Sequence, residues 1–69
     1  MKGYIKLHDK NNGFGFVEGD NGKEYYTRFD GLSSEERSKA EIGMPISFDL
    51  EEGLRGEEAI KVKLLNFQR

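Results

Sequence analysis

The chain of 69 residues has no cysteine, one histidine and one proline. Without cysteine it can form no disulfide, no cysteine-ligated zinc site and no thiol nucleophile. A lone histidine, His8, cannot build a histidine-rich metal site, so we expect no metal and no cofactor. No apolar run approaches the roughly 18 residues that a membrane span needs, and no signal-peptide stretch follows the first residues. We therefore expect a reduced, cytoplasmic protein with no membrane partner.

The short length and the small net charge limit the domain count and the electrostatic attraction of the protein. A chain of 69 residues makes one domain that buries only roughly 60% of its unfolded surface, which excludes a two-layer cofactor-binding enzyme. Eleven basic residues against thirteen acidic ones leave a net charge of −2. Residues 1–30 carry five of each sign, whereas residues 31–69 carry six basic and eight acidic side chains. A long-range electrostatic hold on nucleic acid is thereby excluded, and a local basic patch is not.

Nine glycines separate short segments in which apolar and polar residues alternate. Alternation with a period of two is typical of half-buried strands. It predicts strands at residues 2–9, 13–18, 23–29, 45–51 and 58–65. Between the third and fourth strands, residues 30–43 hold a helix-capping pattern from Ser33 to Glu36, so we expect a long surface loop with a helical turn.

Five short strands with one long connection are typical of a small barrel. We predict an all-β fold, a five-stranded antiparallel Greek-key barrel over residues 1–65, followed by a tail at residues 66–69.

Alternation also assigns the aromatic residues to faces. Phe14 and Phe16 share one face of their strand, and Tyr26 shares a face with Arg28, opposite Phe29. The predicted core consists of Ile5, Val17, Tyr25, Ile46, Phe48, Leu50, Ile60 and Val62. If Val17 lies inside, both phenylalanines lie outside. The alternative places the two phenylalanines in the core and Val17 in water.

Exposed aromatic rings on so small a protein need a physical reason, and nucleic-acid bases supply one. An unpaired base stacked on an aromatic side chain contributes about 1–3 kcal/mol, largely independent of sequence. Lys6 and Arg28, beside the rings, are candidates for phosphate contacts.

The chain resembles the cold-shock domain of bacterial cold-shock proteins in several segments. They are residues 3–6 (Gly-Tyr-Ile-Lys), 13–17 (Gly-Phe-Gly-Phe-Val), 25–29 (Tyr-Tyr-Thr-Arg-Phe), 46–48 (Ile-Ser-Phe) and 52–56 (Glu-Gly-Leu-Arg-Gly). Gly-Phe-Gly-Phe alone is a weak signal, but in register with the other segments it is specific. The similarity extends from about Gly3 to Val62.

The resemblance implies an OB-type barrel that binds single-stranded RNA or DNA and acts as an RNA chaperone or as a regulator of transcription or translation. It implies no catalysis and no small-molecule substrate, and we expect a monomer rather than a homodimer. Matched position by position, the nucleic-acid-binding residues are Lys6, Phe14, Phe16, Tyr26, Arg28, Phe29 and Arg55. Three cations at the phosphates, Lys6, Arg28 and Arg55, predict a log–log salt slope of about −2.

The sequence departs from the family pattern at several positions. Leu7 stands where the family has a stacking tryptophan, and Asp9 where it has an asparagine. Asn12 replaces a lysine, Arg28 replaces a histidine, and residues 56–58 read Gly-Glu-Glu in place of Gly-Pro-Gln. We expect binding that is weaker or directed at a different ligand.

The same residues argue against several other functions. Glu18 stands where a dinucleotide-binding loop needs its third glycine, and His8 has no nucleophile with which to act as a base. The acidic pairs of the last loop are solvated surface rather than a cation site. The alternative function is a small barrel for protein–protein interaction, because tyrosine, phenylalanine and arginine are also enriched at protein interfaces.

Overall fold

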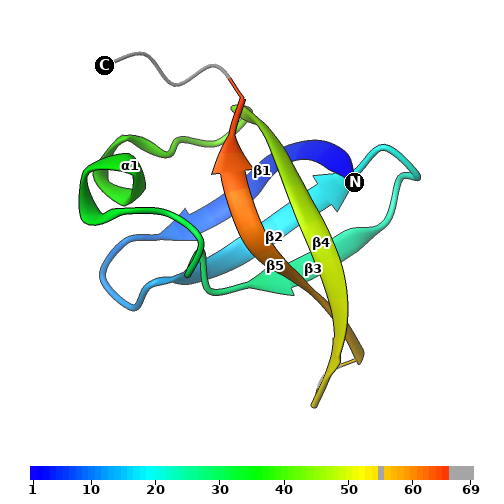
Figure 1. Cartoon of the computed structure of the whole chain (residues 1–69). Helices are drawn as coiled ribbons and strands as arrows, with labels where there is room; N and C mark the ends of the chain where they lie inside the picture. Colours follow the sequence, from blue (N-terminus) through cyan, green and yellow to red (C-terminus); the bar gives the residue numbers. More distant parts are fainter. Residues whose placement is uncertain (55, 66–69) are drawn as a thin grey trace.

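The computed structural model describes residues 1–54 and 56–65. Its elements, shown in Figure 1, are β1 (Lys2–Asp9), β2 (Phe14–Gly19), β3 (Glu24–Thr27), α1 (Ser34–Lys39), β4 (Pro45–Gly53) and β5 (Gly56–Leu64). The strands form a closed barrel in the order β1-β2-β3-β5-β4. The predicted all-β barrel is therefore confirmed. Its neighbouring strands run antiparallel except where β3 and β5 meet in parallel and close the barrel.

The β1–β2 connection is the tight turn that Asn12-Gly13 predicts. The Gly13 backbone adopts a left-handed conformation with a φ of 76°, which costs little only for glycine. Its N–H donates to the carbonyl of Asp9 at 2.8 Å. This turn sets the register in which β1 and β2 pair.

A β-bulge interrupts β1. Ile5 pairs with Val17 and Leu7 pairs with Phe16, so Lys6 is the extra residue on its strand. Ile5 is completely buried, whereas Leu7, two residues later, is 43% exposed. The bulge therefore turns Lys6 and Leu7 both outward, which strict alternation would forbid.

A second bulge changes β5. Ser47 pairs with Lys63 and Asp49 with Ile60, so two residues of β5 oppose Phe48 alone. Lys61, inside the bulge, has a φ of 54°. As a result the buried positions of β5 are Ala59 and Val62, three residues apart. The predicted placement of Ile60 in the core is wrong, because the bulge turns it towards the partly exposed outer surface.

The core lies inside the barrel and under the loop that holds α1. Its buried members are Ile5, Val17, Tyr25, Phe29, Leu32, Ala40, Ile46, Phe48, Ala59 and Val62. Leu50, predicted as core, is partly buried and packs against this cluster. Apart from Ile60, the predicted core residues thus lie in the core or against it.

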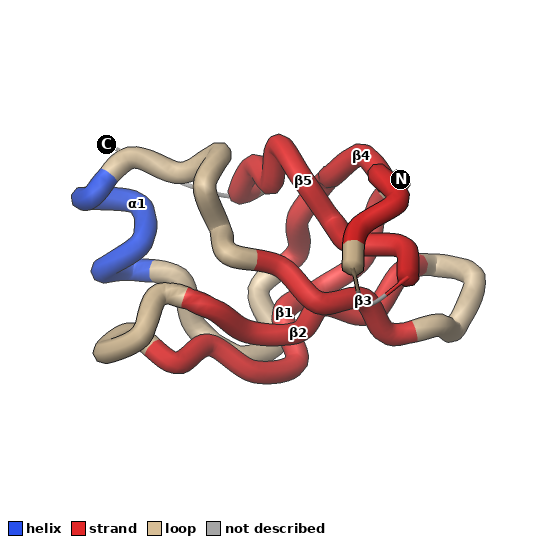
Figure 2. Tube along the Cα trace, turned by 90° about the horizontal axis from the view of Figure 1, so that it is seen from below, coloured by secondary structure: helices blue, strands red, loops and turns tan. Residues whose placement is uncertain are grey.

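The predicted helical turn is α1, six residues long, at one end of the barrel (Figure 2). Ser33 accepts a hydrogen bond from the Glu36 N–H, and the Glu36 side chain accepts one from the Ser33 N–H, which is a complete capping box. No residue of α1 is buried, but Leu32 and Ala40 on either side of it are, and they attach the segment to the barrel. Within residues 1–54 and 56–65, no helix has the length and apolar character needed to cross a membrane.

Candidate nucleic-acid interface

Three aromatic side chains lie together on the outer face of β2 and β3. Phe14 and Phe16 are two residues apart on β2, and Tyr26 of β3 pairs with Phe16. The neighbouring pair Val17 and Tyr25 points the opposite way and is buried. Of the two orientations considered, the structure therefore has the one with Val17 inside. We call Phe14, Phe16 and Tyr26 the aromatic strip; each is partly exposed.

Tyr26 contacts both phenylalanine rings. The Phe14 and Tyr26 ring centroids are 6.0 Å apart with 28° between the planes, close to a stacked arrangement. The Phe16 and Tyr26 centroids are 5.9 Å apart at 73°, an edge-on arrangement. Both distances are typical of favourable aromatic pairs. The rings thus support one another and form a continuous apolar surface that is open to solvent on one side.

Leu7 extends this surface onto β1, since it pairs with Phe16 and is exposed. It occupies the position of the stacking tryptophan in the resemblance. Its aliphatic side chain adds apolar area to the surface but no ring on which a base could stack.

Lys6, which is predicted to contact phosphate, has two carboxylate partners in the structure. Its Nζ lies 3.3 Å from Glu18 Oε1 and 3.4 Å from Glu24 Oε2. Hydrogen bonds to Glu18 and then to Glu24 raise the pKa of Lys6. A hydrogen bond to the Glu18 carboxylate likewise raises the pKa of Tyr4, beside it on β1. Lys6 therefore lies near the aromatic strip with its positive charge paired to two carboxylates.

Arg28 follows Tyr26 by two residues, just beyond the end of β3, and is exposed. Its guanidinium group offers both a positive charge and a planar stacking surface. The remaining predicted cation, Arg55, lies outside the described residues.

The assignment of Phe29 to the interface is wrong, because its side chain is 0% exposed. Its ring lies in the barrel, on the core face that it shares with Tyr25, and its φ of 54° turns the chain directly after β3. The His8 ring lies over it with a centroid distance of 4.4 Å, and His8 Nδ1 is 3.0 Å from the Ala40 carbonyl oxygen. A base cannot reach Phe29 in this structure.

Asp9, which stands where the family has an asparagine, forms hydrogen bonds within the β1–β2 turn. Its carboxylate accepts hydrogen bonds from the N–H groups of Asn11 and Asn12 at 3.1 and 3.2 Å. The Asn12 side chain donates to it at 2.9 Å. These bonds, the Asn12 side-chain one first, lower the pKa of Asp9. The Asp9 carboxylate therefore stabilises the β1–β2 turn, and Asp9 pairs with Phe14 in the strand register.

Acidic side chains outnumber basic ones immediately beside the aromatic strip. Two basic residues, Lys6 and Arg28, accompany three acidic ones, Asp9, Glu18 and Glu24. The two glutamates were not predicted as part of the site. The signal was nevertheless in the sequence, because Glu18 continues the Phe14-Phe16 row with the same spacing of two.

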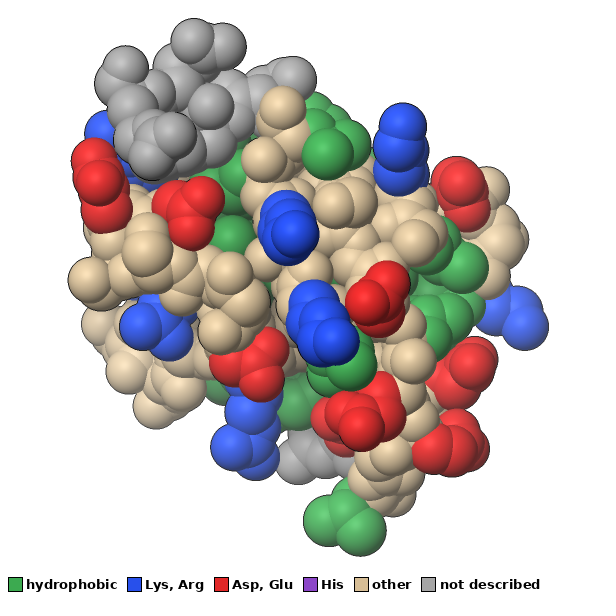
Figure 3. Space-filling model, viewed as in Figure 1, with side chains coloured by type: hydrophobic (Ala, Val, Ile, Leu, Met, Phe, Trp, Pro, Cys, Tyr) green, Lys and Arg blue, Asp and Glu red, His purple; other side chains and the backbone are tan. Residues whose placement is uncertain are grey.

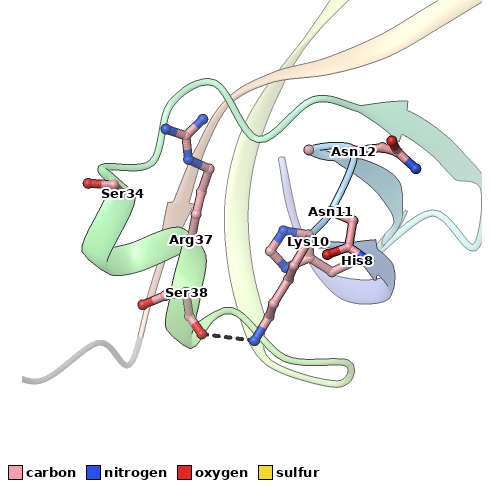
Figure 4. A pocket seen from close by; sticks show the side chains of 8 residues that line it. His8, Lys10, Asn11, Asn12, Ser34, Arg37 and Ser38 are labelled. Carbon is pink, nitrogen blue, oxygen red and sulfur yellow. Dashed lines mark hydrogen bonds between the residues drawn. The ribbon is translucent and has the colours of Figure 1, made fainter.

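A groove that the sequence did not predict separates the β1–β2 turn from α1 (Figure 4). Its volume is about 460 Å³. The lining residues are His8, Lys10, Asn11, Asn12, Gly13, Ser34, Arg37 and Ser38. Lys10 Nζ crosses one end of it, donating to the Ser38 carbonyl at 2.8 Å and to Glu41 at 2.9 Å.

Charge is distributed differently over β4 and β5, which lie in front in Figure 3. Acidic side chains gather towards the tip of the β4–β5 hairpin, where Glu51 pairs with Glu58 and Glu52 with Glu57. Among the described residues, no group of three or more histidine, aspartate or glutamate side chains could hold a metal ion. The carboxylates at the tip of this hairpin repel a phosphate chain.

Comparison with known proteins gives one consistent family. Residues 1–65 match the family described as the 'Cold-shock' DNA-binding domain. Cold shock protein CspC of Bacillus subtilis is 34% identical over 62 residues, which cover 90% of this chain and 94% of that protein. Cold shock-like protein CspB of Bacillus cereus is 34% identical over 65 residues, 94% of this chain and all of that protein. The Major cold shock protein of Streptococcus pyogenes is 31% identical over 64 residues, 93% and 96% of the two chains.

Proposed function

The chain belongs to the cold-shock domain family of nucleic-acid-binding proteins, and from this premise we propose that it binds single-stranded RNA or DNA by stacking bases on the aromatic strip. The observation that carries the proposal is the placement of Phe14, Phe16 and Tyr26 as one solvent-facing surface over a barrel whose core they do not fill. A buried role for these rings would have left the outer face without a binding surface.

Stacking is the main source of affinity in this proposal. Each stacked base contributes about 1–3 kcal/mol, so two or three bases are sufficient for measurable binding. Charge contributes little, because Lys6 is paired with two carboxylates and acidic side chains outnumber basic ones beside the strip. Binding is thus tolerant of sequence and only weakly dependent on salt.

We further propose that the protein acts in the cytoplasm as a monomeric RNA chaperone that keeps strands apart by competing for their base faces. No bond is made or broken in this role, which agrees with membership of a family of binding proteins rather than enzymes.

The test replaces one ring of the strip. Phe16→Ala is expected to weaken binding of a short oligo-pyrimidine by about 5- to 150-fold, the equivalent of one stacked base. Leu54→Ala is the matched control, because Leu54 is a fully exposed apolar side chain beyond the end of β4. Fluorescence anisotropy titrations at low salt measure both variants. Equal affinities of wild type and Phe16→Ala would refute the stacking surface.

A second function, protein–protein interaction through the same surface, is favoured by the exposed Leu7 and by the negative charge of the face. An aliphatic side chain adds to a protein interface more readily than to a base-stacking surface. Mobility shift with a single-stranded oligonucleotide, together with size exclusion, separates the two. Binding with a monomeric elution volume supports the first function, and dimer elution without binding supports the second.

A further inference from the structure

One end of the aromatic strip is closed by two carboxylates. Glu18 lies two residues after Phe16 on β2, and Glu24 lies two residues before Tyr26 on β3, so both continue the rows of the strip on the same face. The two glutamates also pair directly across the β2–β3 register. Like charges in that position repel each other, and a cation placed between them relieves the repulsion.

Lys6 supplies that cation, and it reaches the position because it is the extra residue of the β1 bulge. Its ammonium group contacts Glu18 at 3.3 Å and Glu24 at 3.4 Å. Two carboxylates and one ammonium group leave the cluster with one net negative charge. We call Lys6, Glu18 and Glu24 the ion triad.

The geometry of the ion triad leads us to propose that Glu18 and Glu24 withhold Lys6 from phosphates, so that a bound single strand directs its backbone towards the Arg28 end of the strip. This proposal rests on the proposed function and identifies which basic side chains are available to a bound nucleic acid. A phosphate that approached Lys6 would have to displace two carboxylates or lie within a few ångströms of them. At physiological ionic strength the Debye length is about 8 Å, so salt does not screen this repulsion away.

The triad has a measurable consequence for salt dependence. Single-stranded nucleic acids give a log–log slope of about −0.7 per neutralised phosphate. Three usable cations predict a slope of about −2, whereas withholding Lys6 leaves about −1.4. The wild-type protein is therefore expected to show the shallower slope.

The experiment releases Lys6 with a double substitution, Glu18→Gln together with Glu24→Gln. Glutamine keeps the size of each side chain and removes its charge, and it also removes a repelling cross-strand pair, so the fold is expected to persist. The matched control, Glu36→Gln with Asp49→Asn, makes the same change in net charge on α1 and on β4 and leaves the Lys39–Glu35 ion pair intact. Glutamine at position 36 can still complete the capping box. The triple variant, which adds Lys6→Gln to the first pair, removes the released cation.

Anisotropy titrations of a short oligo-pyrimidine over a salt series give the affinity and the slope of each variant, with thermal unfolding to verify the fold. A unit charge about 6 Å away in water changes affinity about threefold, so the double variant is expected to bind roughly tenfold more tightly at low salt. Its slope should steepen to about −2, and the triple variant should return to about −1.4.

A double variant with the affinity and slope of the matched control would overturn the inference while leaving Phe16-dependent binding, and thus the proposed function, intact. Loss of all binding in wild type and variants alike would overturn both. Binding that is detected only after Lys6 is released would support both.

Discussion

Phe29 gives the sharpest distinction between a ring that stabilises the fold and a ring that binds a ligand. Its side chain is completely buried, although the family resemblance places it among the binding residues. Replacement of a buried phenylalanine by alanine typically lowers the unfolding free energy by about 3–5 kcal/mol. A protein of 69 residues has about 3–10 kcal/mol of stability in total. Phe29→Ala is therefore expected to leave the barrel marginally folded or unfolded.

The surroundings of Phe29 place the cost near the upper end of that range. On one side its ring fits against Gly15, where even an added Cβ would come within 2.7 Å of Phe29 Cε2. On the other side the His8 ring lies over it, and His8 is held by the Ala40 carbonyl. Because β2 is held in the sheet and His8 is tied in place, neither can move in to fill the space left by the missing ring.

Urea unfolding, monitored by circular dichroism, measures the loss of unfolding free energy in Phe29→Ala. Phe16→Ala is the matched variant. Phe16 is only partly buried, so its truncation should cost about 1–2 kcal/mol, well below the cost at Phe29. Phe29→Leu keeps most of the buried volume, and its folded fraction should bind oligonucleotide with wild-type affinity. A stable Phe29→Ala protein that had lost oligonucleotide binding would refute this reasoning, since the ring would then act at the surface.

Two other predictions concern the backbone around the aromatic strip. Gly15→Ala should destabilise the protein severely, because the added Cβ would lie 2.0 Å from the carbonyl oxygen of Leu7 on β1. At Gly22 an added Cβ meets no atom within 4 Å, so Gly22→Ala should lower the unfolding free energy only by the roughly 1–2 kcal/mol that a left-handed backbone costs. Thermal unfolding of the two variants tests this, and equal losses would contradict it. Asp9→Ala should lower stability at pH 7. Hydrogen bonds from Asn12 lower the pKa of Asp9 in the folded state. The ionised carboxylate therefore stabilises the fold at pH values above its ordinary pKa of about 3.9. This stabilisation is lost as the pH falls through the lowered pKa of the folded state. Urea unfolding across the acid range should show the difference between wild type and variant shrinking below about pH 4; a difference independent of pH would count against the assignment.

Most of the fold was predictable from local patterns. Alternation with a period of two gives the strands, because successive side chains of a strand point to opposite faces. The Ser33 to Glu36 spacing correctly predicted a capped helical turn in the long connection. At Phe29 the same alternation already placed the ring on the core face with Tyr25, and the structure agrees with that rather than with the position-by-position resemblance.

The failures of the sequence prediction occur where a strand departs from regular pairing. Ile60 satisfied the alternation with Val62 but faces outward, because the bulge at Lys61 makes Ala59 the next buried position before Val62. Leu7 lies two residues after buried Ile5, so alternation predicts that it is buried too. It is exposed because the β1 bulge falls between the two residues. A bulge depends on how the partner strand is paired, so the sequence of one strand does not reveal it.

Taken alone, the amino-acid order determined where strands, turns and the capped helix form, and that two phenylalanines share a face. These are local properties, set by the period of the backbone and by the conformational freedom of residues such as Gly13. Only the tertiary structure decided which cations a ligand can reach. Lys6, Glu18 and Glu24 come from three strands, and a bulge is what brings the lysine between the carboxylates. Electrostatic contacts between distant segments depend on distances of a few ångströms, and those exist only once the barrel has closed.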